Sequence, residues 1–137
     1  MNWNPMVPEL LVSDFAHSRR FYIEVLGFTA MFERHEPLFV YLDLHGAQLM
    51  LEQDHLSAWI TDELQAPRGR GLNLQIEVDD LTAVRTHLLT AGYPLFRDLH
   101  ESWYDVGDAR EGQRELLVQD PDGYLLRLVE PLSPPTT

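Results

Sequence analysis

Polar side chains alternate with apolar ones in "GLNLQIEVDD", residues 71–80, and three of them could bind or transform a small molecule. Asn73 and Gln75 offer amide donors and acceptors, and Glu77 offers a carboxylate. Strict alternation is typical of a strand with two unlike faces, so we expect these three side chains to share one face. Whether that face meets bulk water or lines a cavity decides what they can do.

Catalytic groups are limited in kind. A carboxylate held in a partly apolar cavity can act as a general base, and Glu52 and Glu77 are the candidates if the protein is an enzyme. The sequence contains no cysteine, which excludes disulfides, thiolate nucleophiles and cysteine zinc sites. The six histidines fall on predicted helices or in predicted turns and loops, and we expect a lone loop histidine to be solvated.

The elements that must position these residues occur twice. "LLVSDFAHSRRFYIEVLGF" (10–28) and "IEVDDLTAVRTHLLTAGY" (76–93) each contain an apolar strand end, an aspartate, an amphipathic stretch, and a glycine followed by an aromatic residue. The aspartate is a typical helix N-cap, and the glycine suits the left-handed residue that ends a helix. The predicted caps are Asp14 and Asp80, and the predicted ends are Gly27 and Gly92.

A hairpin is expected after each helix. The first turns at His45–Gly46, the second turns at "DPDG" (120–123), and an additional strand is expected near 28–34 and 93–98. The chain is therefore predicted to be one α+β domain of two tandem βαβββ modules, whose curved mixed sheets surround a cup. The predicted segments are modules 6–53 and 72–131, a linker 54–71 with one short helix, and a disordered tail 132–137.

Strand parity separates a helix-facing side from an open side in each predicted sheet. In the first hairpin the open side carries Phe39, Tyr41, Asp43, Gln48, Met50 and Glu52. In the last hairpin Leu117, Leu126 and Leu128 are expected to face the helix. The open side there is expected to carry Leu116, Val118, Leu125, Arg127 and Val129, with Arg114 near its start. Apolar walls with a few polar groups are typical of a ligand cup, although loops or a second subunit covering an open sheet would also fit.

Composition limits the class of partner. The 137 residues suit one domain, and no stretch approaches the roughly 18–20 apolar residues of a membrane span. The N-terminal stretch "MNWNPMVPELLV" lacks a basic region followed by a long apolar run, so we expect a cytoplasmic protein. A net charge of −12 disfavours nucleic acid and anionic membranes and is compatible with cationic small molecules.

Three motifs together resemble those of the vicinal oxygen chelate superfamily. They are the "L-x-V-x-D" start at Leu10, Val12 and Asp14, its "EVDDL" counterpart, and "DPDGYLLRLVEP". The superfamily includes glyoxalase I, extradiol dioxygenases and bleomycin-resistance proteins, and the resemblance covers residues 6–131. It implies the glyoxalase/bleomycin resistance fold and a homodimer, sometimes with an exchanged N-terminal arm such as "NWNPMVPE".

The resemblance also aligns the metal-ligand positions of that superfamily. They fall on Val7, near Met50, on Asn73 and on Arg127. Valine and methionine lack the donors that hard divalent ions prefer, and an arginine would repel such an ion. We therefore expect no metal and no cofactor.

The bleomycin-resistance branch is the most similar, on "SDFAHSRRFYIEVLGF", "AQLMLEQ" and "EGQRELLVQDPDGYLLRL". It implies a cup between two subunits in which aromatic rings stack on a planar, cationic ligand. This chain departs from that branch at Glu111, where the resistance proteins often carry a drug-stacking Trp before Gly. The candidate ligand-binding residues are Phe39, Tyr41, Asp43, Met50, Glu52, Trp59, Asn73, Gln75, Trp103, Arg114 and Arg127, with Trp59, Trp103 and Tyr104 reaching the cup from loops.

Three functions follow as hypotheses. The first is a metal-independent binding protein that sequesters a planar or cationic antibiotic or toxic metabolite. The second is an enzyme of the same superfamily, either metal-dependent with displaced ligands or a lyase or isomerase that uses Glu52 or Glu77 as base. The third is a structural or regulatory dimer. Whether the two modules share a cup within one chain or across two chains is left open.

Overall fold

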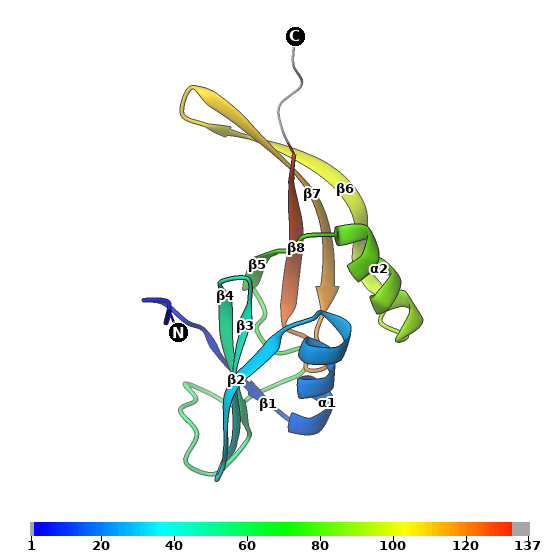
Figure 1. Ribbon diagram of the computed structural model, residues 1–137. Coiled ribbons are helices and arrows are strands. Elements are labelled where there is room, and N and C mark those ends of the chain that lie inside the picture. The colour runs from blue at the N-terminus through cyan, green and yellow to red at the C-terminus, as the bar shows by residue number, and fades with distance from the viewer. Residues whose placement is uncertain (1, 133–137) are drawn as a thin grey trace. The chain divides into compact units, whose positions relative to one another are not determined.

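The computed structural model describes residues 2–132, so residues 133–137 of the predicted tail lie outside the described part. The chain divides into two compact units. The first unit is Met1–Arg70 with Asp120–Tyr124, and the second is Gly71–Gln119 with Leu125–Thr137. Each unit contains a four-stranded mixed sheet and a helix (Figure 1). The predicted α+β fold of two tandem modules is confirmed.

The first unit contains β1 (Glu9–Val12), α1 (Phe15–Arg20), a π-helical turn (Phe21–Val25), β2 (Thr29–His35), β3 (Leu38–Leu44) and β4 (Ala47–Gln53). The strand order is β1-β4-β3-β2, with β1 parallel to β4 and the other pairs antiparallel. The Asp14 side chain caps α1 by accepting the His17 N–H at 3.2 Å. The helix lies along one face of its sheet (Figure 1).

Strand register in the first unit confirms the predicted parity. Val40 pairs with Leu51 and Leu42 with Leu49, and all four are fully or nearly fully buried on the α1 side. The other side, called here the open face, carries the alternate residues of the same strands. In β1 the alternation leaves Glu9 and Leu11 on the open face.

The second unit contains β5 (Asn73–Glu77), α2 (Leu81–Thr90), β6 (Leu95–Val106), β7 (Ala109–Gln119) and β8 (Leu125–Leu132). The strand order is β5-β8-β7-β6, with β5 parallel to β8. Asp80 caps α2 by accepting the Ala83 N–H at 3.1 Å. The core on the α2 side includes Ile76, Leu88, Leu116, Leu126 and Leu128. Within residues 2–132, no helix is long and apolar enough to cross a membrane.

The predicted parity of β7 is wrong. Leu116 pairs with Leu128 in the core, whereas Leu117 pairs with Arg127 on the open face of the second sheet. The turn Asp120–Tyr124 has an odd number of residues, so residues of like parity pair across it, as Gln119 does with Leu125. Residues 116–118 are all apolar, so the sequence does not show by alternation which of them face the core.

Two predicted loop features also differ in the structure. Residues 54–71 form turns and irregular chain without the expected short helix. Trp103 and Tyr104 lie within β6 rather than in a loop, because the hairpin of β6 and β7 continues to the Gly107 turn. Their side chains therefore point to opposite faces of a strand.

Candidate functional site

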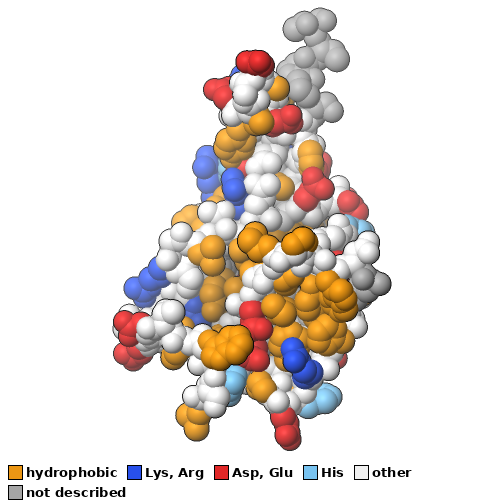
Figure 2. Space-filling view, turned by 90° about the vertical axis from the view of Figure 1, so that its left-hand side faces the viewer, with side chains coloured by type: hydrophobic (Ala, Val, Ile, Leu, Met, Phe, Trp, Pro, Cys, Tyr) orange, Lys and Arg blue, Asp and Glu red, His pale blue; other side chains and the backbone are white. Residues whose placement is uncertain are grey.

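A pocket of about 360 Å³ lies beside β1 on the open face of the first unit. Five of its seven lining residues are aromatic or apolar, and Glu9 and Thr61 are the two polar ones. Over the first unit, Figure 2 shows acidic side chains lying between groups of hydrophobic ones. The lining residues are Glu9, Leu11, Trp59, Ile60, Thr61, Leu64 and Tyr124. Trp59, a predicted ligand-binding residue, is thus part of a pocket.

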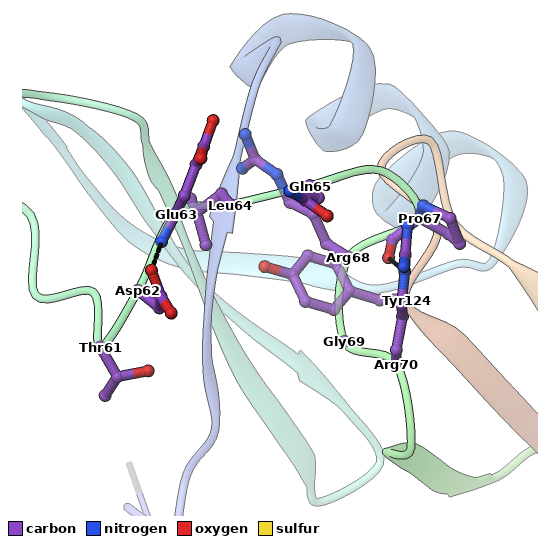
Figure 3. Close-up of a pocket in the computed structure, with 10 residues that line it drawn as sticks. All are labelled: Thr61, Asp62, Glu63, Leu64, Gln65, Pro67, Arg68, Gly69, Arg70 and Tyr124. Carbon is purple, nitrogen blue, oxygen red and sulfur yellow. Dashed lines mark hydrogen bonds between the residues drawn. The ribbon is translucent and has the colours of Figure 1, made fainter.

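A second pocket, of about 400 Å³, adjoins the first and shares Thr61, Leu64 and Tyr124 with it. Figure 3 shows the ring of Tyr124 in the middle of the loop, with acidic side chains on one side and Pro67 and Arg70 on the other. Arg70 is already engaged, because its Nη2 donates to the Ala66 carbonyl at 2.6 Å. We therefore take the first pocket, which is lined by the Glu9 carboxylate and by two aromatic residues, as the candidate site.

Glu9 gives the candidate site its charge. Burial against the pocket raises the pKa of Glu9, and the nearby Glu52 carboxylate raises it further, while Arg34 and His55 lower it. Glu52 lies opposite Leu11 in the register, on the same open face, as predicted. Its Oε2 lies 3.1 Å from Nε2 of His55. The local field therefore favours a cation near Glu9.

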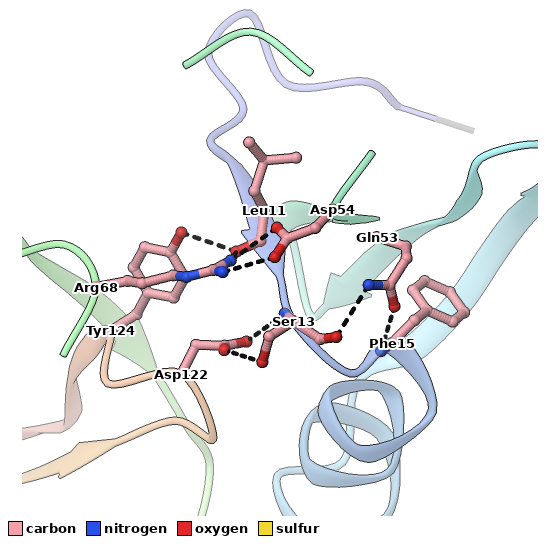
Figure 4. Close-up of polar contacts among 8 residues, drawn as sticks. All are labelled: Leu11, Ser13, Phe15, Gln53, Asp54, Arg68, Asp122 and Tyr124. Atoms are coloured by element: carbon pink, nitrogen blue, oxygen red, sulfur yellow. Dashed lines mark hydrogen bonds and ion pairs between the residues drawn. The ribbon is translucent and has the colours of Figure 1, made fainter. Parts of the chain in front are cut away.

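One arginine fixes the loop that carries Trp59. Arg68 donates from Nη1 and Nη2 to the two carboxylate oxygens of Asp54, at 2.8 and 2.6 Å, and Nη1 also donates to the Leu11 carbonyl at 2.9 Å (Figure 4). Asp54 stands at the start of the irregular segment and Arg68 near its end. A bidentate pair of this kind closes the intervening chain into a loop against β1.

The turn Asp120–Tyr124 completes the pocket from a distant part of the sequence. Tyr124 is 9% exposed, and its hydroxyl donates to the Leu11 carbonyl at 2.9 Å. Asp120 accepts the Tyr22 hydroxyl at 2.7 Å, and Asp122 accepts from the backbone and side chain of Ser13. Burial raises the pKa of Asp120 to about 6, although the hydrogen bonds it accepts act in the opposite direction.

The remaining predicted residues of the first sheet lie on the open face but are largely covered. Phe39 and Tyr41 are 1% and 6% exposed, beneath Trp3 and Phe32. Asp43 and Met50 are half-buried. Asp43 Oδ1 accepts from Gln48 Nε2 at 2.9 Å.

In the second unit, three predicted residues share the open face of the sheet. Gln75 lies beside Arg127 in the parallel pair of β5 and β8, and Asn73 lies beside Leu125. Arg127 Nη1 is 3.7 Å from Glu115 Oε1. Glu77, a candidate base, is exposed at the end of β5.

Glu115 is the polar centre of this face, and the sequence prediction missed it. Its carboxylate is 4% exposed and accepts from Tyr104, Gln113, His100 and Ser102. Burial alone raises the pKa of Glu115, but the hydrogen bonds from Tyr104, Gln113 and His100, with the Arg127 charge, outweigh burial and lower it. The correct register of β7 would have revealed it, because Glu115 has the parity of Leu117.

Arg114 is not on the face where it was expected, and Trp103, which was expected in a loop, lies on that same face. Arg114 Nη2 lies 3.3 Å from Thr82 Oγ1 of α2, and its Nη1 lies 3.9 Å from Glu130. Trp103 pairs with Gly112, whose parity is that of Arg114, and its ring covers that glycine. Both side chains therefore lie on the other face of the sheet from Glu115.

The residues present do not fit a divalent metal. Among residues 2–132, no group of three or more histidine, aspartate and glutamate side chains is arranged to hold one. Of the positions that the sequence resemblance aligns with metal ligands, Val7 has no donor and Arg127 places a guanidinium next to Glu115. A fixed positive charge and an apolar side chain are poor partners for a hard cation.

The comparisons with known proteins agree with this architecture. A family model, Glyoxalase/Bleomycin resistance protein/Dioxygenase superfamily, matches residues 6–128. A virulence protein from Salmonella typhimurium is similar in structure, with a TM-score of 0.69 and 21% identity, covering 96% of this chain and 100% of its own. TioX from Micromonospora sp. ML1 has a TM-score of 0.66 and 19% identity, covering 97% and 100%.

FosX, a fosfomycin resistance protein from Listeria monocytogenes, has a TM-score of 0.61 and 14% identity, covering 93% of this chain and 91% of its own. At identities this low the structural likeness concerns the fold, because one scaffold supports many functions. No curated protein matches the sequence.

Proposed function

Because this chain belongs to the Glyoxalase/Bleomycin resistance protein/Dioxygenase superfamily, we propose that it is a metal-independent binding protein that sequesters a planar or cationic small molecule. The molecule would be an antibiotic or a toxic metabolite, bound by a cytoplasmic homodimer. The observation that carries the proposal is the pocket beside β1, which is lined by the 95% exposed Trp59, by Tyr124 and by the Glu9 carboxylate.

The pocket has the chemistry that holds a flat cation. Stacking and cation–π contacts contribute about 0.5–2 kcal/mol each. A carboxylate beside the ring adds attraction for positive charge and, with the net charge of −12, raises the rate of encounter. Binding alone needs no metal, which agrees with the ligand positions occupied by Val7 and Arg127.

Fluorescence titration tests the proposal, with bleomycin and the planar cation proflavine as probes. We expect each probe to quench the tryptophan fluorescence of the protein. Glu9→Gln removes the charge but keeps the shape of the side chain, so it should lower the affinity for the probe about 3- to 10-fold. Glu24→Gln is the matched control, since Glu24 is exposed and does not line the pocket. Absence of quenching by either probe, or equal weakening in both variants, would count against a cation site at Glu9.

Metal content and mass test the other two parts of the proposal. Purified protein should contain far less than one equivalent of nickel, zinc, iron or manganese. One equivalent, lost together with an activity on chelation, would overturn metal independence. Light scattering after size exclusion should give twice the mass of the chain, and a single-chain mass at micromolar concentration would contradict the homodimer.

One observation favours the enzyme alternative. The pKa of Glu9 is raised by burial and by Glu52, and a raised carboxylate pKa is a property that general bases share. Glu9 therefore joins Glu52 and Glu77 as a candidate base, because it lies on the same open face as Glu52 and lines the pocket. Isomerisation of the glutathione–methylglyoxal adduct, assayed without added metal, should be lost in Glu9→Gln if this alternative holds. No turnover of this adduct by the wild type would count against this form of the enzyme alternative.

A further inference from the structure

Three rings on the open side of β2 and β3 form a continuous aromatic surface, called here the aromatic platform. It consists of Phe32, Phe39 and Tyr41. Phe32 stacks on Phe39 at 5.8 Å and on Tyr41 at 5.4 Å, with interplanar angles of 29° and 19°. The guanidinium carbon of Arg34 lies over the Phe39 ring, 4.1 Å from its centroid, and helps to bury it. Such a surface is suited to another flat ring.

The chain's own Trp3 occupies this surface. Its ring centroid lies 4.8 Å from that of Tyr41 and 5.6 Å from that of Phe32, at interplanar angles of 87° and 77°. These are edge-to-face contacts, in which the positive ring edge meets the negative face of the partner. Trp3 nevertheless remains 53% exposed. The indole thus rests on the platform from one side, as a bound ligand would.

The N-terminal arm that delivers Trp3 is held mainly by one side chain of the sheet. Gln48 Oε1 accepts the Asn4 N–H at 2.9 Å, and Gln48 Nε2 donates to the Asn2 carbonyl at 2.8 Å. The same Oε1 also accepts the Tyr41 hydroxyl at 2.6 Å. Asn4 Nδ2 adds a bond to the Gly46 carbonyl at 2.7 Å. These polar groups can exchange with water when the arm leaves.

We propose that Trp3 is an internal ligand, which holds the place of an indole-sized aromatic group and competes with external ligands for the aromatic platform. The inference rests on the proposed small-molecule function and adds to it a ligand class, a bicyclic aromatic ring, and a regulating element, the arm. When the arm closes the platform in most molecules, the apparent affinity for an external ligand equals the intrinsic affinity multiplied by the fraction of molecules whose platform is open. Release of the arm would uncover the rings that Trp3 contacts, Phe32 and Tyr41, of which Tyr41 was predicted to bind ligand.

Free indole is the direct probe, with its binding measured by calorimetry or ligand-observed NMR. Trp3→Ala should bind indole about 5- to 50-fold more tightly than the wild type, because the variant lacks the competitor and retains the three platform rings. Asn4→Ala, which loosens the arm and keeps the indole, should give a smaller gain of about 2- to 5-fold. Unchanged thermal midpoints would show that the fold is retained.

Trp103→Ala is the matched control, because it removes an indole from the second unit and leaves the platform closed. We expect no gain in indole affinity there. Equal indole affinity in the wild type and Trp3→Ala, or an equal gain in Trp103→Ala, would overturn the internal-ligand proposal. If proflavine quenching is still sensitive to Glu9→Gln in that case, the proposed cation site at Glu9 remains supported. The two proposals can therefore fail separately.

Discussion

Asp120→Asn is the substitution whose effect follows most directly from the structure. Asp120 is 4% exposed, and its Oδ1 accepts two backbone N–H groups, from Asp122 and Tyr124, while Oδ2 accepts the Tyr22 hydroxyl. An asparagine oxygen can keep both backbone bonds, and the tyrosine hydroxyl can rotate to accept from the asparagine amide. The substitution therefore removes a titratable charge and keeps the hydrogen-bonded turn.

The sign of the pH dependence follows from the direction of the shift. Burial raises the pKa of Asp120 from 3.8 to about 6, so the folded protein holds a proton there that the unfolded chain has released. The stabilising contribution is complete below about pH 4 and is lost as the pH rises through 6. A difference of about two pH units at about 1.4 kcal/mol per unit gives about 3 kcal/mol for the whole window.

Urea unfolding at pH 4.5 and pH 8 measures this contribution as a difference between two proteins. The free energy of unfolding of Asp120→Asn minus that of the wild type should rise by about 2–3 kcal/mol between the two pH values. Asp105→Asn is the control, because Asp105 is 88% exposed and its difference should stay constant. A constant difference for Asp120→Asn, or one that falls with pH, would refute the reasoning that burial outweighs the hydrogen bonds.

Three further substitutions test other parts of the structure. Arg68→Gln removes the bidentate bond to Asp54, so it should lower the free energy of unfolding by roughly 1–3 kcal/mol. Residues 55–67 should then become cleavable in limited proteolysis, and a loop that stays uncleaved would contradict the role of the Arg68–Asp54 pair. Gly112→Ala places a Cβ about 2.5 Å from the Trp103 ring, so it should cost about 1–3 kcal/mol in thermal unfolding, and a Trp103→Ala background should remove most of that cost. Glu115→Gln should cost about 2–4 kcal/mol in urea unfolding, because Arg127 loses a buried counter-charge and the hydrogen bonds from Tyr104 and Gln113 are weakened or lost. The exposed Glu111→Gln should cost under about 0.5 kcal/mol, and equal costs for the two variants would contradict the central role of Glu115.

Turn geometry decides where the sequence predicts the faces of the sheets correctly. At the His45–Gly46 turn both residues have positive φ, 49° and 95°, which is typical of the tightest hairpins and fixes a register that can be derived from the sequence. The turn Asp120–Tyr124 is longer, and besides its local bonds to Asp120 it bonds to Tyr22, Ser13 and Leu11, which lie about a hundred residues away. The "DPDG" motif predicts a turn but not its length of five residues, so Arg114 was placed on the wrong face.

The candidate pocket illustrates the same limit. Glu9 and Leu11 follow from the alternation of β1, and Trp59 was recognised as a loop aromatic. Tyr124 was taken as a strand residue, yet it faces Gly69, where an added Cβ would lie 2.6 Å from its ring. The pocket depends on the Arg68–Asp54 closure and on that close approach, both of which are tertiary contacts.

The assignment of Asp120–Tyr124 to the first unit has a consequence for how the chain can be divided. A truncation of the chain near residue 71 would separate the two repeats in sequence. It would also remove Asp120–Tyr124, which accepts hydrogen bonds from the Tyr22 hydroxyl and the Ser13 amide of the first repeat. The N-terminal fragment would then need this loop as an added peptide before it could form its native core. The first repeat thus takes five residues of its compact unit from between two strands of the second.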